Sequence, residues 1–260
     1  MANWVHAEVI ENRHWNKDLF SLVLEADVAP FTAGQFTKLA MEIDGNIIQR
    51  AYSYVNSPGS KYIEIYATRV ADGQLSPRLH ALEKGDKLMI TKDAAGYFVL
   101  DEIPEGEHLW MMATGTALGP YLSILGEDDV WQRFRKVVLV HAVRFAADLS
   151  YQAEIKALKK LHPDRLIVQN FVSREPHSNA LSGRITHSLA DGTLERMTGL
   201  KLSPEQSQVM LCGNPEMVKE VRSLLNEKGL EKTCEESPDI SPQNTTGNME
   251  NEKALSLSHK

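Results

Sequence analysis

The stretch RAYSYVNSP, residues 50–58, has side chains suited to a flat ring that carries phosphates. The Arg50 guanidinium can form charge-assisted hydrogen bonds with a diphosphate. Tyr52 follows two residues later, so it points to the same face of a strand, where its ring would lie against a flat heterocycle. The Ser53 hydroxyl would reach the polar edge of that ring. An isolated Arg-x-Tyr-Ser is more often an ordinary part of a surface strand.

A second stretch, YATRVADGQLSPRL at 66–79, places Gly73 to Ser76 where a helix should begin. Ser76 is a candidate N-cap, Pro77 suits the first helical position, and Gly85 lies beyond the expected end. Backbone N–H groups at such a helix start can hold phosphate oxygens. Taken alone, a helix start of this composition more often has only a capping role.

A third stretch, ATGTALGPYLSIL at 113–125, is a glycine-rich turn between an expected strand and an expected helix. Such a turn at the head of a parallel sheet suits a dinucleotide diphosphate. It lacks the G-x-G-x-x-G spacing, and glycine-rich turns also arise from tight geometry alone.

Three arginines follow expected strands in the second half of the chain: Arg144, Arg174 and Arg184. In a parallel sheet, the first two would lie at the carboxyl ends of the strands, where ligands bind. Together with Ser173 they would favour a nucleotide bearing an additional phosphate. Any one of them is more often a solvated surface residue.

Cys212, in MLCGNPEMV, ends an expected buried strand. Buried cysteines usually act as small hydrophobic residues, although one at this end of a strand can also face a ligand crevice. The only other cysteine is Cys234. Two distant cysteines argue against a disulfide framework and favour a reducing compartment.

The elements that must position these residues have different rhythms in the two halves of the chain. Residues 1–100 contain six short segments rich in β-formers, bounded by turn residues, and one helical segment at 75–86; this pattern predicts a small closed antiparallel barrel. The expected strands are 6–15, 19–26, 36–43, 50–56, 61–70 and 86–92.

From 101 to 232, continuous apolar strands alternate with helices, which predicts a doubly wound parallel sheet covered on both faces. The expected strands are 109–114, 136–143, 165–173 and 207–213, and the expected helices are 119–127, 149–161 and 215–229. The fold class is therefore an antiparallel β-barrel at 1–100 followed by an α/β domain at 101–232.

Composition excludes several classes of protein. Apolar residues make up 42% and charged residues 24% of the 260, as in globular proteins. The longest apolar run, 109–125, is too short and too interrupted to span a bilayer, and no signal peptide is visible at the start. The net charge of −7 argues against nucleic-acid binding. We expect a cytoplasmic protein with no membrane insertion.

The order of these motifs resembles that of the ferredoxin–NADP reductase family, and within it the bacterial ferredoxin/flavodoxin–NADP reductases. Arg-x-Tyr-Ser is followed by the Gly-x-x-Ser helix start, Gly-Thr-Ala-x-Gly-Pro, Ser-Arg-Glu and Cys-Gly-Asn-Pro. The resemblance extends from about residue 3 to residue 232, and this ordered set is highly specific.

The resemblance implies two cofactors, FAD and NADP(H). It makes Arg50 the diphosphate ligand, Tyr52 the residue against the isoalloxazine and Ser53 the hydroxyl near flavin N5, with Cys212 beside the nicotinamide. The implied FAD-binding residues are Arg50, Ala51, Tyr52, Ser53, Tyr66, Ala67, Thr68, Arg69, Gln74, Leu75, Ser76 and Thr116. The implied NADP-binding residues are Val143, Arg144, Ser173, Arg174, Arg184 and Asn214. Ser53 and Cys212 are the implied catalytic residues.

The resemblance also implies an activity: NADPH passes a hydride to FAD, and electrons leave singly to ferredoxin or flavodoxin. Such an enzyme is expected to be a monomer. A related alternative is a reductase that serves free flavin or an oxygenase component. A third is a non-catalytic electron-transfer subunit, but such subunits typically carry a cysteine cluster, which two distant cysteines exclude.

The tail at 233–260 is polar and aperiodic, with five acidic residues and two lysines. The resemblance implies a basic segment and an aromatic terminus here, and the chain has neither. Codons that can encode 232–248, read in a shifted frame, give NMRRKPGHISAEYYW and then a stop. We therefore expect 233–260 to be an aberrant frameshift product without evolved function. A genuine disordered tail also fits its composition.

Overall fold

The computed structural model describes residues 3–232 and 255–258. The described residues form two compact units: 3–99 with 119–127, and 100–118 with 128–232 and 255–258. The chain therefore enters the second unit, returns to the first for one helix, and leaves again. The predictions made for the tail fall outside the described residues, apart from 255–258. No helix in the described ranges is long and apolar enough to cross a bilayer.

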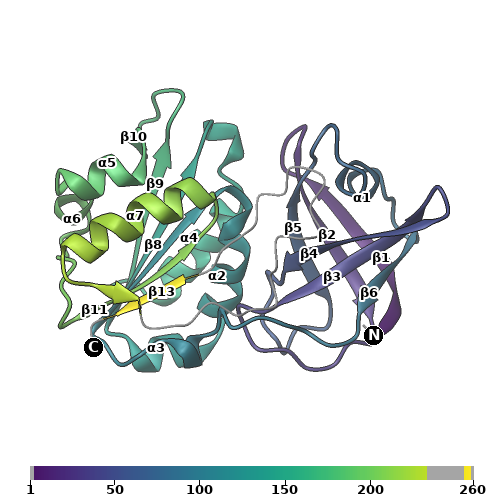
Figure 1. The fold of residues 1–260 in the computed structure, drawn as a ribbon, viewed down its shortest axis with the longest axis horizontal. Helices are drawn as coiled ribbons and strands as arrows, with labels where there is room; N and C mark the ends of the chain where they lie inside the picture. The colour runs from purple at the N-terminus through teal and green to yellow at the C-terminus, as the bar shows by residue number, and fades with distance from the viewer. Residues whose placement is uncertain (1–2, 233–254, 259–260) are drawn as a thin grey trace. The chain divides into compact units, whose positions relative to one another are not determined.

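The first unit is built on a six-stranded antiparallel sheet with the strand order β4-β3-β6-β1-β2-β5 (Figure 1). Its outer strands meet at an antiparallel bridge between Tyr54 and Ile65. This confirms the expected antiparallel barrel. The strands are β1 Trp4–His14, β2 Leu19–Ala26, β3 Phe36–Ile43, β4 Asn46–Ser53, β5 Ile63–Thr68 and β6 Lys87–Thr91.

The hairpin between β3 and β4 corrects one predicted strand. β4 covers Asn46–Ser53 rather than 50–56. Asp44 and Gly45 form its two-residue turn, with φ of 51° and 76°, and Ile43 pairs with Asn46. An Asp-Gly pair with positive φ at both positions matches the right-handed twist of a hairpin, so pairing begins at once after the turn.

The interior of the barrel is apolar and includes Phe20, Leu22, Leu39 and Ile90, all almost fully buried. Helix α1, Ser76–His80, closes on it through the buried Leu79. The predicted cap of this helix was wrong: Leu75 is the N-cap residue and no side chain caps the helix. The Ser76 hydroxyl instead accepts the backbone N–H of Val70 at 3.0 Å, which holds the preceding loop.

The second unit contains a seven-stranded sheet in the order β10-β9-β8-β7-β11-β13-β12. The first five strands are parallel, as expected for a doubly wound sheet, and β13 is antiparallel to both of its neighbours. The strands are β7 His108–Thr114, β8 Lys136–Val143, β9 Leu166–Val172, β10 Leu181–Ser182, β11 Ser207–Cys212, β12 Glu231–Lys232 and β13 Leu255–Ser258.

Three helices, α5, α6 and α7, share one core with the sheet (Figure 1). Side chains at alternate positions of β7, β8 and β11 pack there against residues of these helices. The helices of the shared core are α5 Ile185–Ala190, α6 Thr193–Thr198 and α7 Pro215–Glu227, and α3 Asp128–Arg133 and α4 Gln152–Leu161 also belong to this unit. Helix α2, Leu118–Leu125, lies almost wholly in the first unit. Helices α3, α5 and α6 are not predicted from the sequence, because six residues are too few to establish a helical period.

Candidate functional site

The predicted FAD residues of the first unit lie along a seam between β4 and β5. These strands are the outer strands of the sheet, joined at Tyr54–Ile65 and by the hydrogen bond from Val55 N–H to the Glu64 carbonyl at 2.9 Å. The bridge places Ser53, the last residue of β4, near Tyr66 of β5. The bridge therefore brings two separately predicted motifs side by side. Beyond the bridge, β4 and β5 form no further ladder of hydrogen bonds in the described part of the chain.

On the β4 side of the seam, Arg50, Tyr52 and Ser53 are all partly exposed, whereas Ala51 is exposed. Arg50 and Tyr52 share a strand face, and the Arg50 guanidinium donates to the Gln49 carbonyl at 2.7 Å. Burial raises the pKa of Tyr52, and the Arg50 charge opposes this shift. Tyr52 is therefore a neutral phenol beside a cation, an arrangement suited to a ring with an attached phosphate.

On the β5 side, the predicted residues divide by burial. Tyr66 and Ala67 are buried, and Ala67 belongs to the barrel core, so it can offer a ligand only its backbone. Thr68 is exposed. Arg69 is held by Asp18: its Nη2 and Nε donate to Asp18 Oδ1 at 2.8 and 3.2 Å. The Arg69 guanidinium is thereby fixed before any ligand arrives.

The loop before α1 offers free backbone donors. Gln74 is exposed, whereas the Leu75 side chain belongs to the core. The N–H groups of Gln74, Leu75 and Ser76 have no acceptor within the described part of the chain. Adjacent free amides are donors that a diphosphate can use, and the Arg78 guanidinium lies in the same loop region, where it donates to the Gln74 carbonyl at 2.7 Å. The residues present therefore fit the diphosphate of FAD.

One glycine of the third motif has a packing role in the first unit. A Cβ atom at Gly119 would lie 3.3 Å from Val55 Cγ2. On the same helix, the Ser123 hydroxyl donates to the Asn56 carbonyl at 2.8 Å. Helix α2 therefore holds Val55 and Asn56, which follow Ser53 after the end of β4.

In the second unit, two of the predicted NADP arginines are adjacent. Arg174 N–H donates to the Arg144 carbonyl at 2.9 Å, and Ser173 donates to the Val143 carbonyl from both N–H and Oγ, at 3.1 and 3.2 Å. Val143 itself is buried, whereas Ser173 and both arginines are exposed. Neither guanidinium forms an ion pair with a described acidic residue. Two unpaired cations at the carboxyl edge of a sheet fit a phosphate monoester.

Arg184 follows the short strand β10, which pairs with the end of β9. Its Nη1 atom lies 3.9 Å from Glu220 Oε1, and both side chains are largely exposed. A contact of this length between exposed groups contributes little and is readily exchanged. Arg184 therefore remains available to a phosphate.

The turn after β11 is hydrogen-bonded to the end of the neighbouring parallel strand β7. Asn214 N–H donates to Thr114 Oγ1 at 2.7 Å, and the Asn214 side chain caps α7 by accepting from Glu216 and Met217. Gly213 has φ of +125°, and a Cβ there would lie 2.1 Å from Thr114 Oγ1. The Cys212 side chain, opposite Ala113, is only 2% exposed.

The turn after β7 is linked to β8 by a histidine. Gly115 has φ of +56° and begins the 3-10 turn Gly115–Ala117, which contains the partly exposed Thr116. His141 Nε2 lies 3.1 Å from the Gly115 carbonyl oxygen. Burial lowers the pKa of His141 to about 4.

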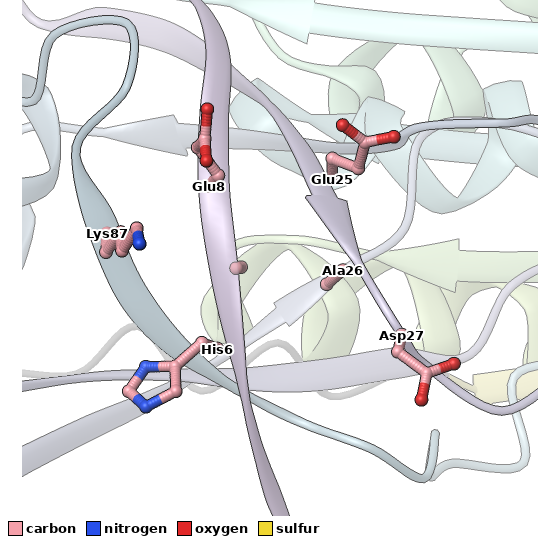
Figure 2. Close-up of a pocket in the computed structure, with 7 residues that line it drawn as sticks. His6, Glu8, Glu25, Ala26, Asp27 and Lys87 are labelled. Carbon is pink, nitrogen blue, oxygen red and sulfur yellow. The ribbon is translucent and has the colours of Figure 1, made fainter.

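A groove on the outer surface of the barrel contains none of the predicted residues (Figure 2). Charged side chains from β1, β2 and β6 line it, with Glu8 directly opposite both Glu25 and Lys87. Its lining residues are His6, Ala7, Glu8, Glu25, Ala26, Asp27 and Lys87. Two carboxylates facing each other across strands do not suit a phosphorylated ligand, so this groove is not the candidate site.

Sequence reasoning missed three side chains that shape these sites: Asp18, Thr114 and His141. Thr114 lies within the glycine-rich stretch 113–125, and its position directly before Gly115 could have indicated its role. Asp18 is 51 residues from its partner Arg69, and His141 lies within an apolar strand. No local pattern marks either of them. The roles given to the predicted residues stay predictions.

Comparison with known families and proteins gives matches along most of the chain. The profile of the Oxidoreductase FAD-binding domain matches residues 7–98, and that of the Oxidoreductase NAD-binding domain matches residues 111–223. A flavodoxin/ferredoxin–NADP reductase of Escherichia coli (strain K12) is 53% identical over 222 residues, which cover 85% of this chain and 90% of the relative.

Two further matches span nearly whole chains. A flavodoxin/ferredoxin–NADP reductase of Buchnera aphidicola subsp. Baizongia pistaciae is 44% identical over 247 residues, 94% of this chain and 99% of the relative. The crystal structure of a ferredoxin NADP+ reductase from Neisseria gonorrhoeae, with bound FAD and NADP, superposes with a TM-score of 0.84 at 30% identity. That superposition covers 88% of this chain and 93% of the other.

Proposed function

The chain belongs to the flavodoxin/ferredoxin–NADP reductase family, and from this premise we propose that it carries electrons between NADPH and flavodoxin or ferredoxin, with FAD as resident cofactor. The observation that carries the proposal is the presence in one chain of two groups of donors suited to phosphate. Free amides lie in the loop before α1 and Arg50 lies on β4, whereas unpaired arginines lie at the carboxyl edge of the parallel sheet.

FAD, when bound, supplies the conversion between a two-electron hydride donor and a one-electron carrier. The protein's contribution is binding and orientation. Arg50 and the amides of Gln74, Leu75 and Ser76 would hold the diphosphate, and the neutral Tyr52 ring would pack against the flavin. The Ser53 hydroxyl would lie at the polar edge of the flavin ring.

The arginine set gives the preference for NADPH. Arg144, Arg174 and Arg184 follow the ends of three neighbouring strands of the sheet. The 2′-phosphate of NADPH meets these positive charges, whereas NADH presents hydroxyls there. We expect a large difference in affinity between the two nucleotides and a small difference in the rate of hydride transfer once each is bound.

The carriers expected from the family are small acidic proteins, whereas this chain has a net charge of −7. Attraction must therefore come from a local group of basic residues rather than from the overall charge. Reduction of the carrier should accordingly slow as ionic strength rises. We propose that the enzyme acts as a monomer in the cytoplasm.

The test starts with the purified full-length chain, which should be yellow and contain FAD. NADPH added anaerobically should bleach the flavin absorbance, and NADH at the same concentration should do so far more slowly. Flavodoxin or ferredoxin added next should be reduced in a salt-dependent way. A colourless protein that takes up no FAD would overturn the proposal. Reduction of free flavin but of neither carrier would support the related reductase class instead.

A further inference from the structure

The His141 side chain is fully buried in the middle of the parallel sheet. It stands on β8 between Ala113 of β7 and Asn170 of β9 in the strand register. Val140, directly before it, and Val143, two residues after it, are buried apolar residues. Near the end of such a strand an aliphatic side chain is the ordinary choice, because a polar ring must find partners for its nitrogens.

Only one nitrogen of His141 has a partner among the described residues. Nε2 lies 3.1 Å from the Gly115 carbonyl oxygen, whereas Nδ1 is buried and unpartnered. A carbonyl oxygen only accepts, so Nε2 carries the proton and donates. Burial lowers the pKa of the ring, which therefore stays neutral at physiological pH.

The same carbonyl oxygen is held from a second side. Leu118 N–H, at the start of α2, also donates to the Gly115 oxygen. One donor comes from the helix that follows and the other from the neighbouring strand. Together they fix the Gly115–Thr116 peptide, in which Gly115 has positive φ. The orientation of Thr116, at the carboxyl edge of the sheet, follows from that peptide.

The unpartnered Nδ1 indicates what the histidine contributes. A leucine would fill a similar volume without leaving a buried nitrogen unpaired, which is unfavourable. What leucine lacks is the donor to the Gly115 oxygen. The histidine therefore carries an unfavourable group for the sake of one hydrogen bond, and that bond acts on the glycine-rich turn rather than on the core.

We propose that His141 is a positioning residue for hydride transfer, because it fixes the Gly115–Thr116 turn. This turn follows Ala113, which pairs with Cys212, the residue expected beside the nicotinamide, and Asn214 N–H holds Thr114 directly before it. This inference rests on the proposed function. His141 touches neither cofactor; it acts through the turn. Loss of its donor should disturb placement of the nicotinamide while leaving the arginines that hold the 2′-phosphate in place.

The experiment compares His141→Leu, which has no donor, with His141→Gln, whose amide can still donate to a carbonyl. The matched control is His108→Leu. His108 is also buried on a strand of this sheet, and burial lowers its pKa too, but it lies at the opposite end of β7. For each FAD-loaded protein, the rate constant of flavin bleaching by saturating NADPH and the Kd for 2′,5′-ADP are measured.

NADPH should bleach the flavin of His141→Leu about tenfold more slowly than that of the native protein, which is the scale of one lost hydrogen bond. The Kd of this variant for 2′,5′-ADP should stay within about twofold of the native value. His141→Gln should recover most of the rate, and His108→Leu should match the native enzyme. An independent readout is ¹⁵N NMR of the histidine rings in the native protein, which should show the Nε2–H tautomer at pH 7.

Three results would overturn the assignment. The first is a rate constant of flavin bleaching in His141→Leu that equals that of the native protein. The second is equal loss of bleaching and 2′,5′-ADP binding without rescue by glutamine, which indicates a general structural role. The third is an Nδ1–H tautomer or an imidazolium at pH 7. A native enzyme that NADPH does not bleach would instead contradict the proposed function itself.

Discussion

The two candidate binding regions differ in how firmly their side chains are held before a ligand arrives. Along the β4–β5 seam, Arg69 is paired with Asp18 at 2.8 Å, Tyr66 is buried, and Ser76 holds the loop through Val70. At the carboxyl edge of the parallel sheet, Arg144, Ser173 and Arg174 are exposed, and only their backbones and the Ser173 hydroxyl are fixed.

This difference matches what each region is proposed to bind. A pre-ordered site pays little entropy on binding and so favours tight retention, as suits a resident FAD. Long exposed arginines must be ordered each time a phosphate arrives, which limits affinity and favours release, as suits a nucleotide exchanged at every turnover. The sharpest tests replace a residue of one region and check that binding at the other region is unchanged.

The largest expected effect is a decrease in the free energy of unfolding of the second unit at low pH. Burial lowers the pKa of His141 to about 4, whereas an unfolded histidine titrates near 6.5. Below pH 6.5 the unfolded chain therefore binds a proton that the folded chain does not. The free energy of unfolding should fall as the pH drops from about 6.5 to about 4, by up to about 3 kcal/mol from this group, and stay constant above that window.

Hydrogen exchange of peptides from β7 and β8, followed from pH 7 to pH 4.5, measures this effect. Other buried histidines, such as His108, contribute in the same direction. The relevant quantity is thus the difference between the native protein and His141→Gln, which should lose part of the pH dependence. Identical pH profiles for the two proteins would show that His141 does not titrate as described.

Arg174→Ala tests the exposed region. Removing a charge-assisted phosphate contact should weaken NADPH by about 1.5–3 kcal/mol, while NADH binding changes little and FAD content is unaffected. Arg135→Ala is the control, because Arg135 is also exposed but precedes β8 at the opposite edge of the sheet. Equal losses for both nucleotides would place the phosphate contact elsewhere.

Ser76→Ala tests the pre-ordered region. It removes the acceptor of Val70 N–H and so loosens the loop that presents the free amides. FAD affinity should fall by about 1 kcal/mol, roughly fivefold, with the Kd for 2′,5′-ADP unchanged. FAD fluorescence on dilution measures the release. The control is Ser60→Ala, an exposed serine of the same unit, and an equal loss of FAD in both variants would contradict the loop argument.

Ser53→Ala, for which we expect an effect no larger than that of Ser76→Ala, separates chemistry from binding. The hydroxyl is assigned to hydride transfer, so flavin bleaching by NADPH should slow about fivefold, the scale of about 1 kcal/mol, while FAD stays bound. Absorbance spectra and stopped-flow bleaching measure the two quantities. A stable protein that emerges without flavin would show that Ser53 anchors the cofactor instead.

Much of the fold could be predicted because its signals are local. The strand 136–143 was predicted with the bounds that β8 has, since a mostly apolar, valine-rich run between Lys136 and Arg144 admits few alternatives. The start of β4 was wrong because its pairing depends on the Asp44–Gly45 turn, which was not used. Helices α5 and α6 were missed because a six-residue helix is stabilised by tertiary packing rather than by its own sequence pattern.

The sequence by itself determined the order of the motifs, the change from barrel to parallel sheet, and the residue types that can bind phosphate, because each depends on neighbours along the chain. Only the tertiary structure decided which of them share a site. The Tyr54–Ile65 bridge aligns two motifs across the β4–β5 seam, and Asp18 reaches Arg69 across 51 residues. His141 reaches Gly115 across 26 residues. Such contacts depend on strand register and burial, which the whole fold sets.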